Sequence, residues 1–321
     1  MKPSPNGRGV SLRVHQWRVD IASDSRAFWQ ALENHLPHYL RPCGTRKHED
    51  RLIPISVRVW ETRNVPVSLR RRDPSAMRRF RKFGVASCVD FVSNRISVFL
   101  DTIRRPSGAF VYHHGFLLPL FSLIRKWKAV FVHASLVARD RKGVLIAGKS
   151  RAGKSTLTIP FLQNGFQYLS DENPILTVWD GHVMGKSVIN RIGLSPLALG
   201  NFPGLRERFQ WYPETGKYYI DAEDVSSGCL GTACAVDTVI FPHFRRRGRF
   251  RVRRLATADL FTRLLQDEYF ILAFRSERKG ENKFHKGHVE LLTALATSAR
   301  GFSVDYRRED IEALPLRLAY L

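Results

Sequence analysis

The residues with the clearest chemistry form one short loop near the middle of the chain, where the pattern G-x-x-x-x-G-K-[ST] is matched in full. Its members are Gly148, Lys149, Ser150, Arg151, Ala152, Gly153, Lys154 and Ser155. The two glycines permit a tight turn, so that successive backbone N–H groups converge on a phosphate. The lysine would reach the β and γ phosphates of a nucleotide, and the serine would offer its hydroxyl to Mg²⁺. With the adjoining Thr156, these positions are the predicted nucleotide-binding set.

The sequence on either side of this loop favours a strand before it and a helix after it. Residues 144–147 are a short apolar run with the length and character of a buried strand. A helix should begin at Lys154 and end near Asn164 and Gly165, and its positive dipole end would then face a bound anion. Pro160 should kink or shorten this helix, because proline removes a backbone hydrogen bond. The alternative is a glycine-rich strand–helix turn that binds no ligand.

Two adjacent carboxylates follow the helix, at the end of a second predicted strand over residues 166–171. Parallel strands joined by one helix end at the same edge of a sheet, so Asp171 and Glu172 should lie beside the loop. A carboxylate there can deprotonate an attacking hydroxyl or hold Mg²⁺ through water. An exposed acidic turn is the alternative. His133, at the end of a predicted strand over 129–133, is by itself more often a core or surface residue.

Residues 132–137, the loop and residues 169–172 together resemble the bacterial HPr serine kinase/phosphorylase family. The resemblance covers about residues 130–175 and is closest to HPr-kinase-like relatives found with peptide-tailoring genes, such as lasso-peptide kinases. It implies a P-loop-containing α/β catalytic domain centred on one sheet, like that of the ATP-dependent phosphoenolpyruvate carboxykinases. It also implies that ATP and Mg²⁺ bind, and that the γ-phosphoryl group is transferred to a serine hydroxyl.

The same resemblance implies roles for individual residues. Asp171 would be the general base, and it would share Mg²⁺ with Ser155 and Glu172. His133 would lie near the transferred phosphoryl group, and Lys154 would bind the phosphates and take part in catalysis.

Two further cations are weaker candidates for contact with a phosphate or the substrate. Lys217 lies in residues 216–221, which echo a lysine-containing strand of the HPr-kinase-like relatives. Arg191 is a candidate of the same kind. An exposed lysine on a strand is the alternative for Lys217.

Three features depart from HPr kinase itself. Glu172 stands where that enzyme usually has a second Asp, and Thr156 stands where it usually has Glu. The glycine-rich signature near its C-terminus has no convincing counterpart in this chain. These differences argue against HPr as the substrate and against the phosphorylase reaction, and they leave ATP binding untouched.

The charge balance fits either anionic partners or a solvated basic surface with no specific polyanion. The chain has 321 residues, and 52 Lys and Arg against 29 Asp and Glu leave a net charge of +23. Such a surface attracts nucleic acid, anionic lipid, phosphorylated ligands or acidic peptides. Two segments are rich in arginine. Residues 69–82 are predicted to be either a nucleic-acid-binding patch or a solvated connector. Residues 245–254 are predicted to be either a docking arm for an acidic peptide or polyanion, or an edge strand protected by charge.

The predicted function is that of an ATP-dependent kinase whose acceptor is a small protein or peptide. One interpretation of the basic segments is that this acceptor is acidic. The alternatives are a catalytically weak ATP-binding regulatory module and a nucleic-acid-associated NTPase, which rests on charge alone. Four cysteines without CxxC spacing fit a reducing cytoplasm. No signal peptide is recognisable, and the longest apolar stretch, residues 116–124, is about half a membrane span. Oligomeric state is left open.

The predicted elements divide the chain into an α+β region over 1–108 and a catalytic domain over 109–321. Strands are expected at residues 10–14, 53–60, 86–91, 95–100, 129–133, 144–147, 166–171, 236–241, 249–253 and 302–306, and helices at 25–36, 109–124, 154–163, 257–272 and 289–299.

Overall fold

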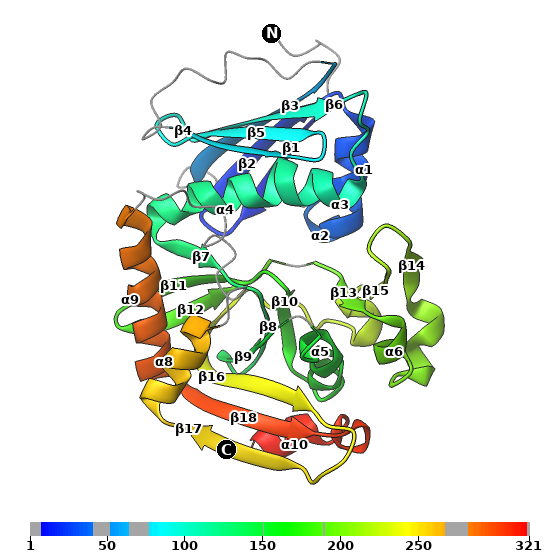
Figure 1. Ribbon diagram of the computed structural model, residues 1–321, viewed down its shortest axis with the longest axis vertical. Coiled ribbons are helices and arrows are strands. Elements are labelled where there is room, and N and C mark those ends of the chain that lie inside the picture. Colours follow the sequence, from blue (N-terminus) through cyan, green and yellow to red (C-terminus); the bar gives the residue numbers. More distant parts are fainter. Residues whose placement is uncertain are drawn as a thin grey trace. The chain divides into compact units, whose positions relative to one another are not determined.

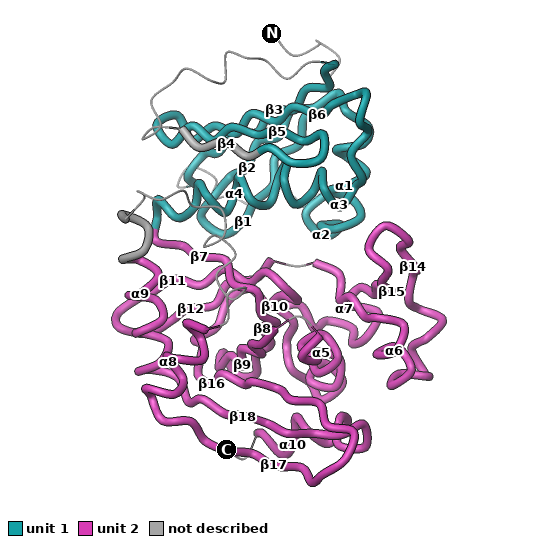
Figure 2. The backbone as a smooth tube through the Cα atoms, in the orientation of Figure 1, with its two compact units in different colours: residues 1–127 teal, residues 128–321 magenta. Residues whose placement is uncertain are grey.

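The computed structural model describes residues 8–40, 52–63, 77–149, 151–188, 190–266 and 282–319. The chain forms two compact units, Met1–Trp127 and Lys128–Leu321 (Figure 2). Both contain sheets and helices, so the prediction of a mixed α/β chain is confirmed. No helix among the described residues is long and apolar enough to cross a membrane.

Unit 1 is a six-stranded sheet with helices on one face (Figure 1). The strand order is β1-β2-β3-β6-β5-β4. The strands are β1 (Arg8–Val14), β2 (Trp17–Ser23), β3 (Ile53–Thr62), β4 (Met77–Lys82), β5 (Val85–Asp90) and β6 (Arg95–Asp101). The helices are α1 (Arg26–His35), α2 (Pro37–Leu40), α3 (Gly108–Phe110) and α4 (Leu118–Ile124), and a π-helical stretch, Val111–Leu117, joins the last two.

The helical segment 108–124 belongs to unit 1, whereas the sequence analysis placed it at the start of the second domain. Its apolar side chains explain the placement. The rings of Phe116 and Phe28 pack edge to face, 6.4 Å apart, and Gly115 lies close enough to Val98 that a Cβ would come within 3.2 Å of it. The division between the two compact units falls after Trp127.

Unit 2 contains a nine-stranded and a three-stranded sheet. The large sheet comprises β7 (Ala129–Phe131), β8 (Ala134–Arg139), β9 (Lys142–Ala147), β10 (Gln167–Asp171), β11 (Ile175–Trp179), β12 (His182–Lys186), β16 (Ala233–Phe244), β17 (Arg251–Leu255) and β18 (Arg300–Tyr306). The small sheet comprises β13 (Ile192–Leu194), β14 (Gln210–Tyr212) and β15 (Lys217–Ile220). The helices are α5 (Lys154–Gln163), α6 (Pro196–Leu199), α7 (Ala222–Val225), α8 (Thr257–Gln266), α9 (Asn282–Ser298) and α10 (Leu314–Ala319).

The order of the large sheet places β8 between β9 and β10 and antiparallel to both. Strands β9 and β10 therefore run parallel to each other and end at the same edge of the sheet. On the other side of β9 lies β16, the longest strand, which is parallel to β9 and to β18 and antiparallel to β12.

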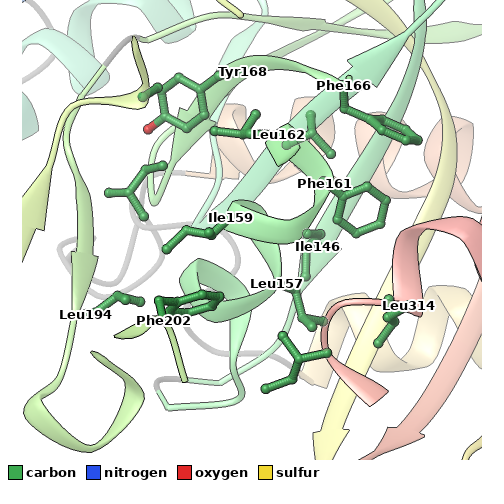
Figure 3. Packing of buried hydrophobic residues seen from close by; sticks show 14 of the residues in the cluster. Ile146, Leu157, Ile159, Phe161, Leu162, Phe166, Tyr168, Leu194, Phe202 and Leu314 are labelled. Atoms are coloured by element: carbon green, nitrogen blue, oxygen red, sulfur yellow. The ribbon is translucent and has the colours of Figure 1, made fainter. Parts of the chain in front are cut away.

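Helix α5 is anchored by apolar burial on nearly every side (Figure 3). Leu157, Ile159 and Leu162 are fully buried, and each such side chain contributes roughly 1.5–3 kcal/mol to stability. A helix that is apolar all round belongs inside a domain. Pro160 does not end α5, which continues to Gln163, and the amide of Asn164 donates to the Pro160 carbonyl at 2.8 Å. This burial fixes the first turn of α5, and with it the loop that leads into the helix.

The other face of the large sheet is covered by α8 and α9. Leu264 from α8 and Leu292 and Leu295 from α9 are buried in one cluster with Leu136 of β8 and Leu145 of β9. The sheet edge that carries the glycine loop is therefore held between two apolar layers.

Candidate functional site

Three chain segments meet at one edge of the large sheet in unit 2. Ala134, the first residue of β8, pairs with Ala147, the last residue of β9. On its other side β8 pairs with β10, and the N–H of Glu172 donates to the carbonyl of Ala134 at 3.1 Å. His133, Gly148 and Glu172 are the residues next to these pairs. The structure therefore brings the histidine, the glycine loop and the acidic pair to the same sheet edge.

The loop itself is a tight turn built on left-handed backbone conformations. Gly148 has φ 143°, Arg151 has φ 68° and Gly153 has φ 98°, and the N–H of Ala152 donates to the Lys149 carbonyl at 3.1 Å. Glycine adopts such angles without steric cost, which explains its place at both ends of the loop. Lys149 and Arg151 are exposed, and Ser150 lies outside the described residues.

The second glycine is also required by a close neighbour. The hydroxyl of Tyr306, at the end of β18, lies 2.0 Å from the position that a Cβ on Gly153 would occupy. Tyr306 is itself buried, and desolvation raises its pKa to about 12, so the phenol stays neutral. No side chain other than hydrogen fits at residue 153 without a shift of this tyrosine.

Lys154 opens α5 and turns back into the loop. Its ammonium donates to the carbonyls of Gly148 at 2.8 Å and Lys149 at 3.2 Å, and the side chain is largely buried. Thr156, in the same helical turn, is also buried. A lysine held in this way places its charge against the loop, where a phosphate would be bound.

Asp171 ends β10 and is enclosed by hydrogen-bond donors. The hydroxyl of Ser135 donates to its Oδ1, and the N–H of Gly193 lies 3.4 Å from its Oδ2. The hydroxyl of Ser155 in the loop lies close enough to lower its pKa. The residue is only 1% exposed. Burial, and then the neighbouring charge of Glu172, raise its pKa above the ordinary value, although the two hydroxyls act in the opposite direction. Asp171 is thus a proton acceptor of raised basicity that lies beside the loop serine.

Asn190 holds the end of β10 in place. Its side-chain oxygen accepts from the N–H of Asp171 at 2.9 Å, and its amide donates to the Asp171 carbonyl. The same oxygen accepts from Tyr168, whose hydroxyl also donates to the Asn190 backbone carbonyl at 2.8 Å. Neither Asn190 nor Ser135 was among the predicted site residues. Ser135 lies within residues 132–137, which carry part of the family resemblance, and no local sequence pattern marks Asn190.

Glu172 and the two cations predicted to contact a phosphate differ in their surroundings. Lys217, the first residue of β15, lies 2.9 Å from Glu172, and this carboxylate raises the pKa of the lysine. Arg191 instead pairs with Asp221 at 3.0 Å and donates to the hydroxyl of Tyr212. The structure therefore brings Lys217 to the acidic pair and engages Arg191 within the small sheet.

The donor set at this edge suits a hard cation. Ser155, Asp171 and Glu172 offer a hydroxyl and two carboxylates, and Mg²⁺ is typically held by one or two carboxylates together with substrate phosphates. No group of three or more His, Cys, Asp or Glu side chains with metal-binding geometry occurs in the part of the chain that the structure describes. The hydroxyl and the two carboxylates of this set fit a magnesium–nucleotide complex, in which phosphate oxygens and waters supply the other ligands.

Comparisons with known proteins give little beyond this geometry. No protein-family model matches the chain, and no curated protein matches it. Among solved structures, it is similar to the Hpr(Ser) kinase/phosphatase from Coxiella burnetii, with 15% identity and a TM-score of 0.31 over 59% of this chain and 93% of that chain. A functional proposal for this protein therefore depends on the residues of the site.

Proposed function

We propose that this protein is an ATP-dependent kinase that transfers the γ-phosphoryl group to a hydroxyl, a serine of a small protein or peptide. One observation carries the proposal. A buried carboxylate, Asp171, lies beside Ser155 of a phosphate-binding loop whose sequence pattern is complete. A turn that binds no ligand would not need a desolvated carboxylate of raised pKa against its serine, and such groups gather at functional sites.

The loop would bind the phosphates of ATP. Its backbone N–H groups and the first turn of α5 supply partial positive charge, and Lys154 adds a full one. Lys149, Arg151 and Thr156 complete the proposed nucleotide-binding set, and Lys217 would meet a phosphate from the side of the small sheet. This arrangement supplies the positioning and charge neutralisation on which phosphoryl transfer depends.

Ser155, Asp171 and Glu172 would hold Mg²⁺, which neutralises phosphate charge when it is bound. The proximity of Ser155 to Asp171 supports this assignment, because P-loop proteins commonly hold the metal with the loop hydroxyl and an aspartate at a strand end.

For the chemical step, Asp171 would accept the proton of the acceptor hydroxyl as that oxygen attacks the γ phosphorus. The bond from phosphorus to the β,γ-bridging oxygen breaks, and ADP leaves with the electron pair. A raised pKa suits a general base that works near neutral pH. Glu172, whose side chain is 27% exposed, is the rival for this proton, and His133 would lie beside the transferred group.

Transfer of label from γ-labelled ATP tests the proposal. Wild-type protein with Mg²⁺ and serine-containing peptides encoded beside its gene would be compared with Lys154→Ala and Asp171→Asn. Both variants should lose about a hundredfold or more in rate, and Lys142→Ala, at the opposite end of β9, should not. ATP binding without transfer to any peptide, unchanged by Asp171→Asn, would instead indicate a regulatory ATP-binding module.

A further inference from the structure

A basic edge strand in unit 2 has no part in the proposed chemistry. Seven arginines occur in residues 245–254. They are Arg245, Arg246, Arg247, Arg249, Arg251, Arg253 and Arg254, and all of them are exposed. Among the described residues only Arg245 of this set forms an ion pair, with Asp305 at 3.1 Å. A dense positive patch therefore covers β17 and the turn before it.

The backbone of this strand is also available on one side. β17 pairs antiparallel with β18, from Arg251 opposite Asp305 to Leu255 opposite Gly301, and no other described strand pairs with it (Figure 1). An edge strand of this kind can accept an extended peptide as an additional strand. Charged side chains commonly protect an edge strand from such pairing. Here the arginines extend from β17 into the turn before it, and a continuous positive surface of this kind is complementary to an acidic partner.

The patch begins next to the proposed site. Asp305, the partner of Arg251, precedes Tyr306, whose hydroxyl lies against Gly153 of the loop. On β16, Pro242 lies within 3.9 Å of the Cβ position of Gly148. The turn at residues 245–250 thus lies at the end of the sheet that carries the phosphate loop. From there, β17 runs toward the opposite end of the sheet. A segment paired with β17 would have one end directed toward the phosphate loop.

We infer that β17 and the turn 245–250 bind an acidic, extended segment of the phosphate acceptor as an added strand. The inference rests on the proposed kinase function and names the recognition element for its substrate. Arginine side chains would contact alternate carboxylates of the segment, while the outer edge of β17 pairs with its backbone. The acceptor hydroxyl would lie beyond the end of this segment, at the loop.

A peptide fits this surface better than a nucleic acid does. Binding of single strands relies on aromatic faces on which bases stack. Phe250, the aromatic residue of this turn, is covered by the guanidinium of Arg317 at 4.6 Å from its ring. A nucleic acid would use the charges alone and would leave the edge of β17 unpaired.

The test is fluorescence anisotropy with a labelled peptide of alternating Glu and Thr, measured on the full chain at low and moderate salt. Arg251→Glu with Arg253→Glu should weaken binding by about tenfold or more. The double variant Arg246→Glu, Arg247→Glu is a second charge reversal, placed in the turn outside the strand. Arg141→Glu with Lys142→Glu changes the net charge equally at the opposite end of β9 and should leave the affinity unchanged. Methylation of every second backbone nitrogen in the peptide should abolish binding when the methylated nitrogens are those that face β17. Methylation of the other set should leave binding intact.

Three results of the binding assay would overturn the inference. The first is equal peptide affinity of the charge-reversed variants and the wild-type protein. The second is equal affinity for the two peptides that are methylated on alternate sets of nitrogens. The third is tighter binding of a single-stranded DNA that displaces the peptide. Weaker ATP binding in the reversed proteins would also overturn it, because the arginines would then belong to the nucleotide site. Peptide binding is measured without ATP, so a protein that binds the peptide yet transfers no phosphate refutes the kinase proposal and leaves the docking surface standing.

Discussion

The ammonium of Lys217 lies 2.9 Å from Oε1 of Glu172 and ties the first residue of β15 to the end of β10. The carboxylate raises the pKa of Lys217, so the lysine remains charged throughout the neutral range. Both side chains are partly exposed, at 38% and 27%, and the stability gained from such a pair is below about 1 kcal/mol. The ion pair thus matters more for the charge it places beside the loop than for folding.

We expect Lys217→Met to raise the dissociation constant of Mg²⁺–ATP about tenfold, because one charge-assisted phosphate contact is lost. Its melting temperature should stay within about 2 °C of the wild-type value. Isothermal titration calorimetry measures the affinity, and Lys142→Met, at an exposed lysine far along β9, is the control. Unchanged ATP affinity in Lys217→Met would show that this lysine serves only its ion pair.

The sign of the pH dependence follows from the direction of the lysine shift. A lysine whose pKa is raised by folding contributes stability that is complete below the unfolded value of 10.5. That contribution is lost only as the pH rises through the folded pKa. Assays between pH 7 and 9 therefore measure the intact pair.

Asp171→Asn should stabilise the protein at neutral pH while it abolishes transfer. Folding raises the pKa of this carboxyl, so the native state binds its proton more tightly and stability falls as the pH rises from 3.8 through the folded value. A neutral amide avoids the cost of burying the charge and can still accept from Ser135. Each pKa unit is worth about 1.4 kcal/mol, and each kcal/mol raises the melting temperature by about 2–4 °C in a unit of this size.

Differential scanning fluorimetry at pH 5 and pH 8 checks this expectation, and the gain should be larger at pH 8. Glu172→Gln is the matched variant, because its carboxylate is partly solvated and carries no comparable burial cost. A lower melting temperature of Asp171→Asn at pH 8 would contradict the prediction. If Glu172→Gln stops transfer and Asp171→Asn only weakens Mg²⁺ dependence, the general base is Glu172.

Local signals explain the parts of the fold that the sequence predicts well. The apolar run before the loop, the helix start at Lys154 and its end before Asn164 are each set by neighbouring residues, and the structure has β9 and α5 at these places. Strands β3, β5, β6 and β18 likewise follow from alternation or short β-branched runs.

Long-range pairing explains what the sequence could not predict. Strand β9 follows β8 directly through the two-residue turn at Asp140 and Arg141, but nothing in residues 134–139 indicates that β10, which lies beyond α5 in the chain, pairs with the other side of β8. The sequence also does not decide whether the apolar helix over 108–124 packs on the strands that precede it or on those that follow it. Ser135 and Asn190 are ordinary polar residues until the fold brings both to Asp171. The arginine-rich residues 69–76 and Cys43 lie outside the described residues, so their predicted roles stay predictions.

Asn190→Ala should destabilise the protein by about 1–3 kcal/mol and slow transfer. The substitution leaves the buried N–H and carbonyl at the end of β10 without side-chain partners, and unsatisfied buried groups carry costs of this size. Tyr168→Phe is the control, because Asn190 keeps both bonds to the Asp171 backbone. Urea denaturation and single-turnover rates measure the two effects. If Asn190→Ala loses the expected stability of about 1–3 kcal/mol while its transfer rate is unchanged, Asn190 does not position Asp171.

Gly153→Ala should weaken ATP binding by about tenfold or more, for two separable reasons. The left-handed backbone at φ 98° costs about 1–2 kcal/mol for a residue with a Cβ. The new methyl would also meet the Tyr306 hydroxyl at 2.0 Å, so the tyrosine or the loop must shift. Gly165→Ala isolates the first cost, since that glycine has φ 79° and no atom within 4 Å of its Cβ position.

Tyr306→Phe isolates the second cost. Removal of the hydroxyl leaves the ring carbon Cζ as the nearest atom, at 3.3 Å, which is tight but can be relieved by a small movement. The double variant Gly153→Ala, Tyr306→Phe should therefore recover part of the ATP affinity lost in Gly153→Ala, with a coupling of about 0.5–3 kcal/mol between the two sites. Additive losses in this cycle would mean that Tyr306 does not shape the loop, and that backbone strain alone explains the glycine.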